Sequence, residues 1–229
     1  MNKLSIPMTK SENTGGWIYL ILQIFLIPLI LVICNELLSN PFSDAEINFL
    51  FFALNFICVT VICSRFLLTS VKDFFARPFV CLRSAFIGLL LYFVLSFGVN
   101  LLIGHIKPDF INENDSSIAD LSQQNFTLIS IGTVLLVPTV EEVFYRGLIF
   151  RGLYNRCSWA AYIVSSAIFS AIHIVGYIGV YDTLSLLLSF LQYLPAGFCL
   201  AWAYANADNI FAPILIHTAV NQIATSAMR

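Results

Sequence analysis

Hydrophobic residues along this chain gather in long runs that short polar stretches separate. A helix needs roughly 17–25 apolar residues to cross a bilayer, and seven runs have about that length. They cover residues 17–34, 47–68, 84–106, 126–150, 159–178, 183–205 and 210–228. The pattern predicts an all-α fold, a polytopic transmembrane helix bundle of about seven spans.

Short polar connections join these runs. Residues 69–80 mix basic residues with phenylalanines, a pattern that fits either a segment lying flat at the membrane interface or a plain connector. Residues 107–125 are polar and acidic and are predicted to form a loop on the outer side. The sequence contains no internal repeat and no shift of composition, so residues 1–229 are predicted to form a single integral membrane domain.

The composition favours a membrane protein and excludes nucleic acid as a partner. Hydrophobic residues make up 59% of the chain and charged residues 10%, whereas soluble domains carry about 25% charged residues. The formal net charge is −2, and there is no basic patch of the kind that a phosphate backbone requires. The six cysteines form no C-x-x-C pair, so they are predicted to be apolar packing residues.

Lysine and arginine residues predict the orientation of the bundle, because cytoplasmic loops are enriched in them. With the N-terminus in the cytoplasm, only Lys107 and Arg229 lie outside. The residues on the inner side are then Lys3, Lys10, Arg65, Lys72, Arg77, Arg83, Arg151 and Arg156. The first run, residues 17–34, is longer than the roughly 7–15 residues of a signal-peptide core, so we interpret it as a retained anchor helix. The protein is expected in the cytoplasmic membrane of a bacterium, with its N-terminus in the cytoplasm.

A few ionisable residues lie inside the predicted spans. Of the 13 acidic residues, Glu141 and Glu142 lie inside a predicted span. Arg146, His173 and His217 also lie inside spans. A charge at the centre of a membrane helix costs about 2.5–3.5 kcal/mol to insert, so such residues are functional candidates. Counting about 1.5 Å per residue from the cytoplasmic ends places Glu141, His217 and His173 at depths of about 15, 12 and 20 Å. Three separate helices are therefore expected to bring them to a similar level.

The spacing of the charged residues predicts an ion pair. Glu142 and Arg146 stand four residues apart and share a helix face, so each would offset much of the insertion cost of the other. Glu141 is rotated by about 100° from Glu142, and it must therefore face a different partner. Pro138 removes a backbone hydrogen bond just before the two glutamates and is expected to kink the helix.

Two further pairs stand one helical turn apart: Phe169 with His173, and His217 with Asn221. For any one of these polar residues alone, a hydrogen bond that joins two membrane helices explains its presence as well as a functional role does. Six polar residues on three helices favour a shared functional site over a purely structural role.

Three motifs in the second half of the chain resemble the CPBP family of intramembrane proteases, also called Abi. They are E-E-x-x-x-R at residues 141–146, F-x-x-x-H at residues 169–173 and H-x-x-x-N at residues 217–221. The family includes CAAX prenyl proteases and bacteriocin-processing enzymes. The likeness covers about residues 126–225, which would form the catalytic core. The best-known members have eight spans, whereas this chain is predicted to have about seven.

The resemblance implies hydrolysis of a peptide bond inside the membrane. Glu141 would be the general base, and together with His173 it would hold and activate the attacking water. His217 and Asn221 would donate hydrogen bonds to the developing oxyanion. The supporting residues would be Glu142, Arg146 and Phe169.

The resemblance leaves the use of a metal open, because the family has been described both as metalloproteases and as metal-free glutamate proteases. Glu141, His173 and His217 form a known type of zinc ligand set that leaves one position for water. Asn221, one turn from His217, suits an oxyanion site better than a ligand position, which favours the metal-free mechanism. Zinc therefore stays an open alternative at this point.

The expected partners are the lipid bilayer and a membrane-associated peptide or protein, either a leader- or bacteriocin-type peptide or a CAAX-type substrate. A non-catalytic bacteriocin immunity protein or scaffold is the alternative function. A transporter or proton relay is a third class, but the chain lacks the internal repeats that many transporters have.

Overall fold

The computed structural model describes residues 4–228, and these form helices with no strand among them; an isolated bridge joins Ile178 to Tyr181. The first half contains α1 (Lys10–Leu37), α2 (Asp44–Ile62), α3 (Ser64–Ala76), α4 (Pro78–Ile106) and α5 (Glu113–Ile131). The second half contains η1 (Gly132–Leu136), α6 (Val137–Glu142), η2 (Val143–Phe150), α7 (Arg151–Tyr154), α8 (Ser158–Ile172), η3 (Val175–Tyr177), α9 (Thr183–Ala207) and α10 (Phe211–Ala227). The segments η1 and η2 are π-helical, and η3 is a 3₁₀ turn.

The all-α membrane bundle is confirmed, with a span count that is approximate. Within the described residues, five helical segments are long and apolar enough to cross a membrane: α1, α2, α4, the continuous segment Glu113–Tyr154, and α9. The remaining helices of the bundle, α8 and α10, have 15 and 17 residues. The prediction that residues 159–178 form one span is wrong, because α8 ends at Ile172. Fifteen helical residues rise only about 22 Å, which is less than the hydrocarbon thickness of about 30 Å.

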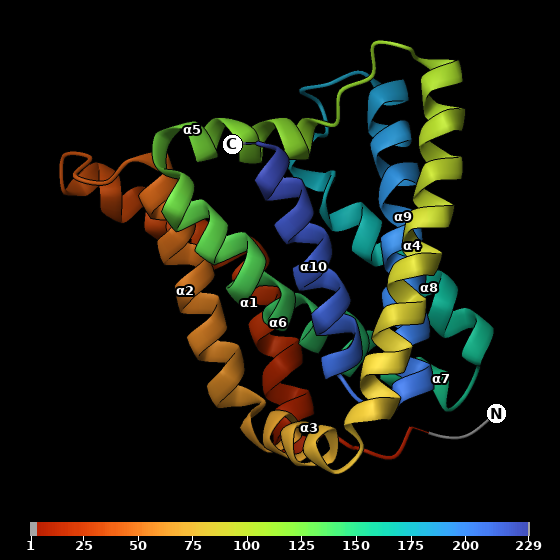
Figure 1. Cartoon of the computed structure of the whole chain (residues 1–229). Helices are drawn as coiled ribbons and strands as arrows, with labels where there is room; N and C mark the ends of the chain where they lie inside the picture. Colours follow the sequence, from red (N-terminus) through yellow and green to blue (C-terminus); the bar gives the residue numbers. More distant parts are fainter. Residues whose placement is uncertain (1–3, 229) are drawn as a thin grey trace.

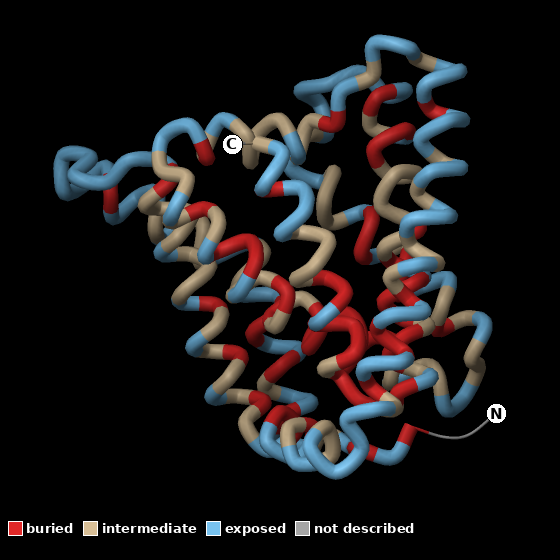
Figure 2. Tube along the Cα trace, in the orientation of Figure 1, coloured by how far each residue is buried: buried red, intermediate tan, exposed pale blue. Residues whose placement is uncertain are grey.

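Large apolar side chains cover the outside of the bundle. Phe25 on α1 and Phe97 on α4 are 70% and 67% exposed, and Figure 2 shows that α4 is exposed along most of its length. Apolar surface of this extent has no favourable contact with water, whereas lipid chains cover it without cost. The chain is therefore an integral membrane protein.

The span predicted over residues 47–68 is confirmed as α2, but it ends earlier than predicted because the chain turns sharply between α2 and α3. Helix α2 ends at Ile62, and α3 begins at Ser64. Helix α3 crosses the end of the bundle that also holds α7 and the first described residues (Figure 1). It buries Phe66 against the core, and the backbone N–H of Phe66 donates to Glu12 of α1 at 2.7 Å. Of the two alternatives for this part of the chain, the structure favours the segment lying flat.

The predicted outer loop is largely helical. Helix α5 begins at Glu113, where the side chain of Asn112 accepts hydrogen bonds from the backbone N–H groups of Asn114 and Asp115. Capping by asparagine and acidic residues in the first turn both stabilise a helix start. A kink at Asn125, with φ −155° and ψ 90°, separates this polar part from the apolar part. Figure 1 shows the polar part lying across the end of the bundle opposite α3.

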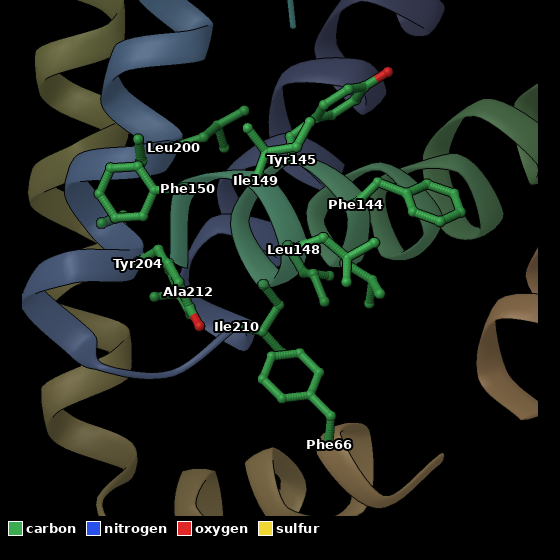
Figure 3. Packing of buried hydrophobic residues seen from close by; sticks show 14 of the residues in the cluster. Phe66, Phe144, Tyr145, Leu148, Ile149, Phe150, Leu200, Tyr204, Ile210 and Ala212 are labelled. Carbon is green, nitrogen blue, oxygen red and sulfur yellow. The ribbon is translucent and has the colours of Figure 1, made fainter. Parts of the chain in front are cut away.

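The buried core surrounds η2. Every residue from Val143 to Phe150 is buried, and Figure 3 shows Phe144, Leu148 and Phe150 projecting to different sides of this segment. Buried residues gather in the half of the molecule nearer α3 (Figure 2). The glutamate and arginine motif therefore lies on a helix enclosed by protein, where irregular backbone is tolerated in a membrane.

Helices α8 and α9 approach closely at Gly197. A Cβ atom on Gly197 would lie 2.8 Å from the Cα atom of Ser166. We expect Gly197→Ala to destabilise the protein by about 1–3 kcal/mol, because the two backbones must separate. Denaturant unfolding in detergent micelles measures this change. Gly98→Ala is the matched control, since a Cβ there meets nothing within 4 Å; equal stability of the two variants would contradict the prediction.

Candidate active site

A cavity of about 610 Å³ opens beside the buried core, and four residues of the three motifs line it. These are Glu141 from α6, His173 at the end of α8, and His217 and Asn221 from α10. The structure thus brings together, on one cavity wall, residues that lie up to 80 positions apart in the sequence. The other three motif residues, Glu142, Arg146 and Phe169, are buried in the core and contact one another or these side chains.

Glu142 joins two partners from opposite sides. Its Oε2 lies 3.1 Å from Nε of Arg146, and its Oε1 lies 2.9 Å from Nδ1 of His217. Glu142 and Arg146 are completely buried, and His217 is 6% exposed. An ionised carboxylate only accepts hydrogen bonds, so Nδ1 of His217 carries the proton of this bond. Glu142 therefore fixes the orientation of the His217 ring and directs its Nε2 away from the ion pair.

Arg146 is held by more than its carboxylate. Its Nη2 donates to the backbone carbonyl of Gly197 at 3.3 Å, and its guanidinium lies 4.8 Å from the ring centroid of Phe169. A cation over an aromatic face is stabilised by the ring quadrupole, most strongly away from water. Phe169 thus contacts the charged centre directly, and its supporting role stays a prediction.

Glu141 has a different environment from its neighbour. Its side chain is 22% exposed, compared with 0% for Glu142. Its Oε2 lies 3.9 Å from Nε2 of His217, and within residues 4–228 this oxygen accepts no hydrogen bond. The two adjacent glutamates are therefore divided between a buried ion pair and a cavity wall. Of the two, it is Glu141 that lines the cavity with an unpaired carboxylate oxygen, where a water molecule or substrate group can bond to it.

His173 lies immediately after the last residue of α8 and is held by two aromatic contacts and one hydrogen bond. Its Nδ1 lies 2.7 Å from the carbonyl oxygen of Phe169. A carbonyl only accepts, so Nδ1 donates and Nε2 of the neutral ring is an acceptor. The ring stacks on Tyr193 with centroids 4.2 Å apart. The available nitrogen of His173 is thus a hydrogen-bond acceptor.

Asn221 is oriented by the backbone of η1. Its Nδ2 donates to the carbonyl oxygen of Thr133 at 2.8 Å. An amide nitrogen carries two hydrogens, and this bond uses one of them. π-Helical turns occur often at functional sites, where they change the direction of backbone groups. Asn221 therefore keeps one N–H group for a ligand in the cavity that its side chain lines.

The cavity also includes residues that the motifs did not predict. Asn55, Asp115, Tyr145 and Tyr193 line it, and Asn55 accepts a hydrogen bond from Tyr19 at 3.0 Å. The sequence signal that could have identified such a lining residue is a polar residue within an apolar run, as at Asn55. Helices outside the three motifs therefore contribute part of the wall.

The proposed zinc ligands do not form a metal site in this arrangement. Among the described residues, no group of three or more His, Cys, Asp or Glu side chains is arranged to hold a metal ion. Glu141, His173 and His217 share the cavity, and each ring uses Nδ1 for a protein hydrogen bond, as metal-ligating histidines also do, which leaves Nε2 available. The zinc set therefore stays an alternative prediction, and we derive no step through a metal. The six cysteines are free.

Comparison with known proteins finds a match in the part of the chain that contains the three motifs. Residues 123–223 match the family model described as type II CAAX prenyl endopeptidase Rce1-like. Over 111 residues the chain is 32% identical to "Putative membrane peptidase YdiL" of Bacillus subtilis (strain 168). This match covers 48% of the chain and 41% of that relative, so it spans less than half of either protein. No solved structure matches the chain. The CPBP resemblance of the three motifs is confirmed.

Proposed function

We propose that this chain, whose residues 123–223 match the type II CAAX prenyl endopeptidase Rce1-like family model, is an intramembrane endopeptidase. The reaction is hydrolysis of a peptide bond in a membrane-associated peptide or protein. The observation that carries the proposal is that the two adjacent glutamates contact different nitrogens of the same histidine. Glu142 fixes His217 at 2.9 Å, and Glu141 faces the cavity 3.9 Å from the other nitrogen of the same ring.

The attacking water lies between Glu141 and His173. Each water hydrogen is accepted by one of these groups, the carboxylate and Nε2 of His173. Glu141 removes a proton as the water oxygen bonds to the carbonyl carbon of the substrate. The same proton then passes to the leaving amine when the C–N bond breaks. Glu141 therefore acts first as a base and then as an acid.

The oxyanion forms beside α10. Asn221 donates the N–H group that its bond to Thr133 leaves available. His217, whose ring Glu142 holds through Nδ1, is the second oxyanion residue and acts through Nε2. Donors held rigidly in a site that excludes water stabilise a developing charge strongly. Their rigid supports here are a backbone carbonyl and a buried ion pair.

The apolar residues in the cavity wall favour an apolar peptide segment as the substrate. Ile24, Phe51, Phe52 and Val137 line it together with the polar groups. Such a wall accepts a segment already embedded in lipid, because both environments are apolar. The substrate class is a leader- or bacteriocin-type peptide or a CAAX-type protein. The name of the matching family model supports the second.

The test is a comparison of membrane-associated peptides from cells that produce the wild-type protein or Glu141→Gln. We expect fragments that are present only with the wild type, and their ends map the cleaved bond. Glu36→Gln, at an exposed position of α1, is the control and should yield the wild-type fragments. Identical peptides in all three samples would contradict the proposal. Retained bacteriocin protection by Glu141→Gln would then favour the immunity or scaffold alternative.

Asn221 provides a second test of the mechanism. We expect Asn221→Ala to lower kcat by roughly 100–1,000-fold, since one oxyanion donor is lost. The assay uses a fluorogenic peptide that carries the mapped cleavage junction. Gln222→Ala is the matched control, because Gln222 is exposed and bonds to Ser226 on the same helix. An unchanged kcat for Asn221→Ala would remove this residue from the oxyanion site.

A further inference from the structure

His173 needs support from outside its own helix. It is the C-cap residue of α8, where helical hydrogen bonding ends and no longer restrains the backbone on both sides. The ring touches Phe169 of the same helix, with centroids 4.7 Å apart. Its opposite support is Tyr193 of α9, with centroids 4.2 Å apart and an interplanar angle of 26°. The orientation of the ring in the cavity therefore depends on where Tyr193 lies, as well as on the hydrogen bond from Nδ1 to the Phe169 carbonyl.

Tyr193 is in turn held by the first turn of α5. Its hydroxyl donates to Oδ1 of Asp115 at 2.9 Å and accepts from Nδ2 of Asn114 at 3.0 Å. The hydroxyl carries one hydrogen, so the shorter contact with Asp115 takes it in preference to Asn112 at 3.4 Å. Asn112 also donates to Gln192, the neighbour of Tyr193, at 2.6 Å. Both hydrogen-bonding capacities of the Tyr193 hydroxyl are thus used by α5.

These contacts form a connected series from α5 to the catalytic cavity. Asp115 bonds to Tyr193, Tyr193 stacks on His173, and both Asp115 and Tyr193 line the cavity beside His173. Asp115 lies outside residues 123–223, the part that matches the family model. The sequence places it in a polar stretch that predicted only a loop. Its position in the fold is what connects it to the site.

We propose that Asp115 and Tyr193 are positioning residues, which hold the His173 ring so that Nε2 faces the cavity. The catalytic consequence rests on the proposed protease function, whereas the positioning itself does not. Tyr193 acts on the ring directly, and Asp115 acts through the Tyr193 hydroxyl. A group that orients a catalytic side chain without binding substrate affects kcat more than KM.

The kinetic test uses Tyr193→Phe, Asp115→Ala and the double variant, with the fluorogenic peptide described above. Tyr193→Phe keeps the stacking ring and removes the hydroxyl. We expect each single variant to lower kcat by about tenfold, because small displacements of a catalytic group are costly, with KM within about twofold. The double variant should be no slower than Tyr193→Phe alone. A further tenfold loss in the double variant would show that Asp115 does not act through Tyr193.

Ser117→Ala is the matched control for the loss of a hydrogen bond that joins α5 to the rest of the bundle. The Ser117 hydroxyl accepts from Tyr177 at 2.9 Å, and Ser117 is not among the described residues that line the cavity. Since this bond does not involve Tyr193 or His173, we expect kcat to stay within about twofold of the wild type. A tenfold loss in this control would assign the effect to general docking of α5 and overturn the specific role of Tyr193.

A second measurement is independent of proteolysis. The chain has three histidines, so ¹⁵N-histidine labelling gives few ring signals, and His173→Gln assigns those of His173. We expect the wild-type ring to show Nδ1 protonated and Nε2 unprotonated, and both Tyr193→Leu and Asp115→Ala to shift these signals. Unchanged signals in both variants would overturn the inference. Shifted signals in a protein that cleaves no peptide would support the positioning and reject the protease function.

Discussion

Replacing Glu141 with glutamine is expected to lower kcat by roughly 100–10,000-fold, which is the usual contribution of a general base. Glutamine keeps the size of the side chain but cannot take a proton from water. Glu141 lies on the cavity wall and belongs to no close ion pair, so its loss leaves no buried charge without a partner. The variant should therefore fold and insert as the wild type does. The fluorogenic peptide measures kcat, and the yield of monodisperse protein in detergent measures folding.

The control for this variant is the same exchange at Glu36, which is exposed on α1 and should leave kcat unchanged. Wild-type activity in Glu141→Gln would remove Glu141 from the mechanism. Glu142 could not take over as the base, since it is completely buried and paired with Arg146.

Local sequence spacing predicted the parts of the site that lie on one helix. The pair Glu142 and Arg146 follows from a separation of four residues, and the structure places their side chains 3.1 Å apart. The rotation of Glu141 away from this face follows from the same geometry, and Glu141 lies on the cavity wall. Hydropathy likewise located the apolar helices, because the bilayer imposes one length and one composition on them.

Contacts between helices could not be predicted in this way. Glu142 and His217 are 75 residues apart, and no periodicity connects them. Hydropathy also could not find the end of α8, because the apolar run continues to residue 178 while the backbone leaves the helix after Ile172. Gly176, in the 3₁₀ turn, and Gly179, with φ +86°, are the local signals that a helix over the whole run was unfavourable.

The polar first half of α5 shows a different limit. Its sequence lacks an apolar face long enough to predict a helix, and its stability comes from Asn112 as a cap and from contacts with α9. The same contacts hold Tyr193 beside His173. A segment that hydropathy assigns to a loop therefore contributes to the site through tertiary structure alone.

Replacing Arg146 with methionine is expected to destabilise the protein by about 3–5 kcal/mol, the usual effect of leaving one member of a buried ion pair without its partner. Arg146 and Glu142 are both completely buried, so water cannot solvate the remaining carboxylate. The variant also loses the contacts with Gly197 and Phe169. Denaturant unfolding in detergent micelles measures the loss, and wild-type stability would contradict the prediction.

The double variant Arg146→Met with Glu142→Gln separates the stabilising role of the pair from its role in the site. Replacing a whole buried ion pair with neutral residues of similar size often costs little stability, so we expect the double variant to recover most of the loss. Activity should stay low, because a neutral amide holds Nδ1 of His217 less firmly than the carboxylate does at 2.9 Å. Recovery of both stability and kcat would show that the ion pair serves the fold alone and that His217 needs no charged partner.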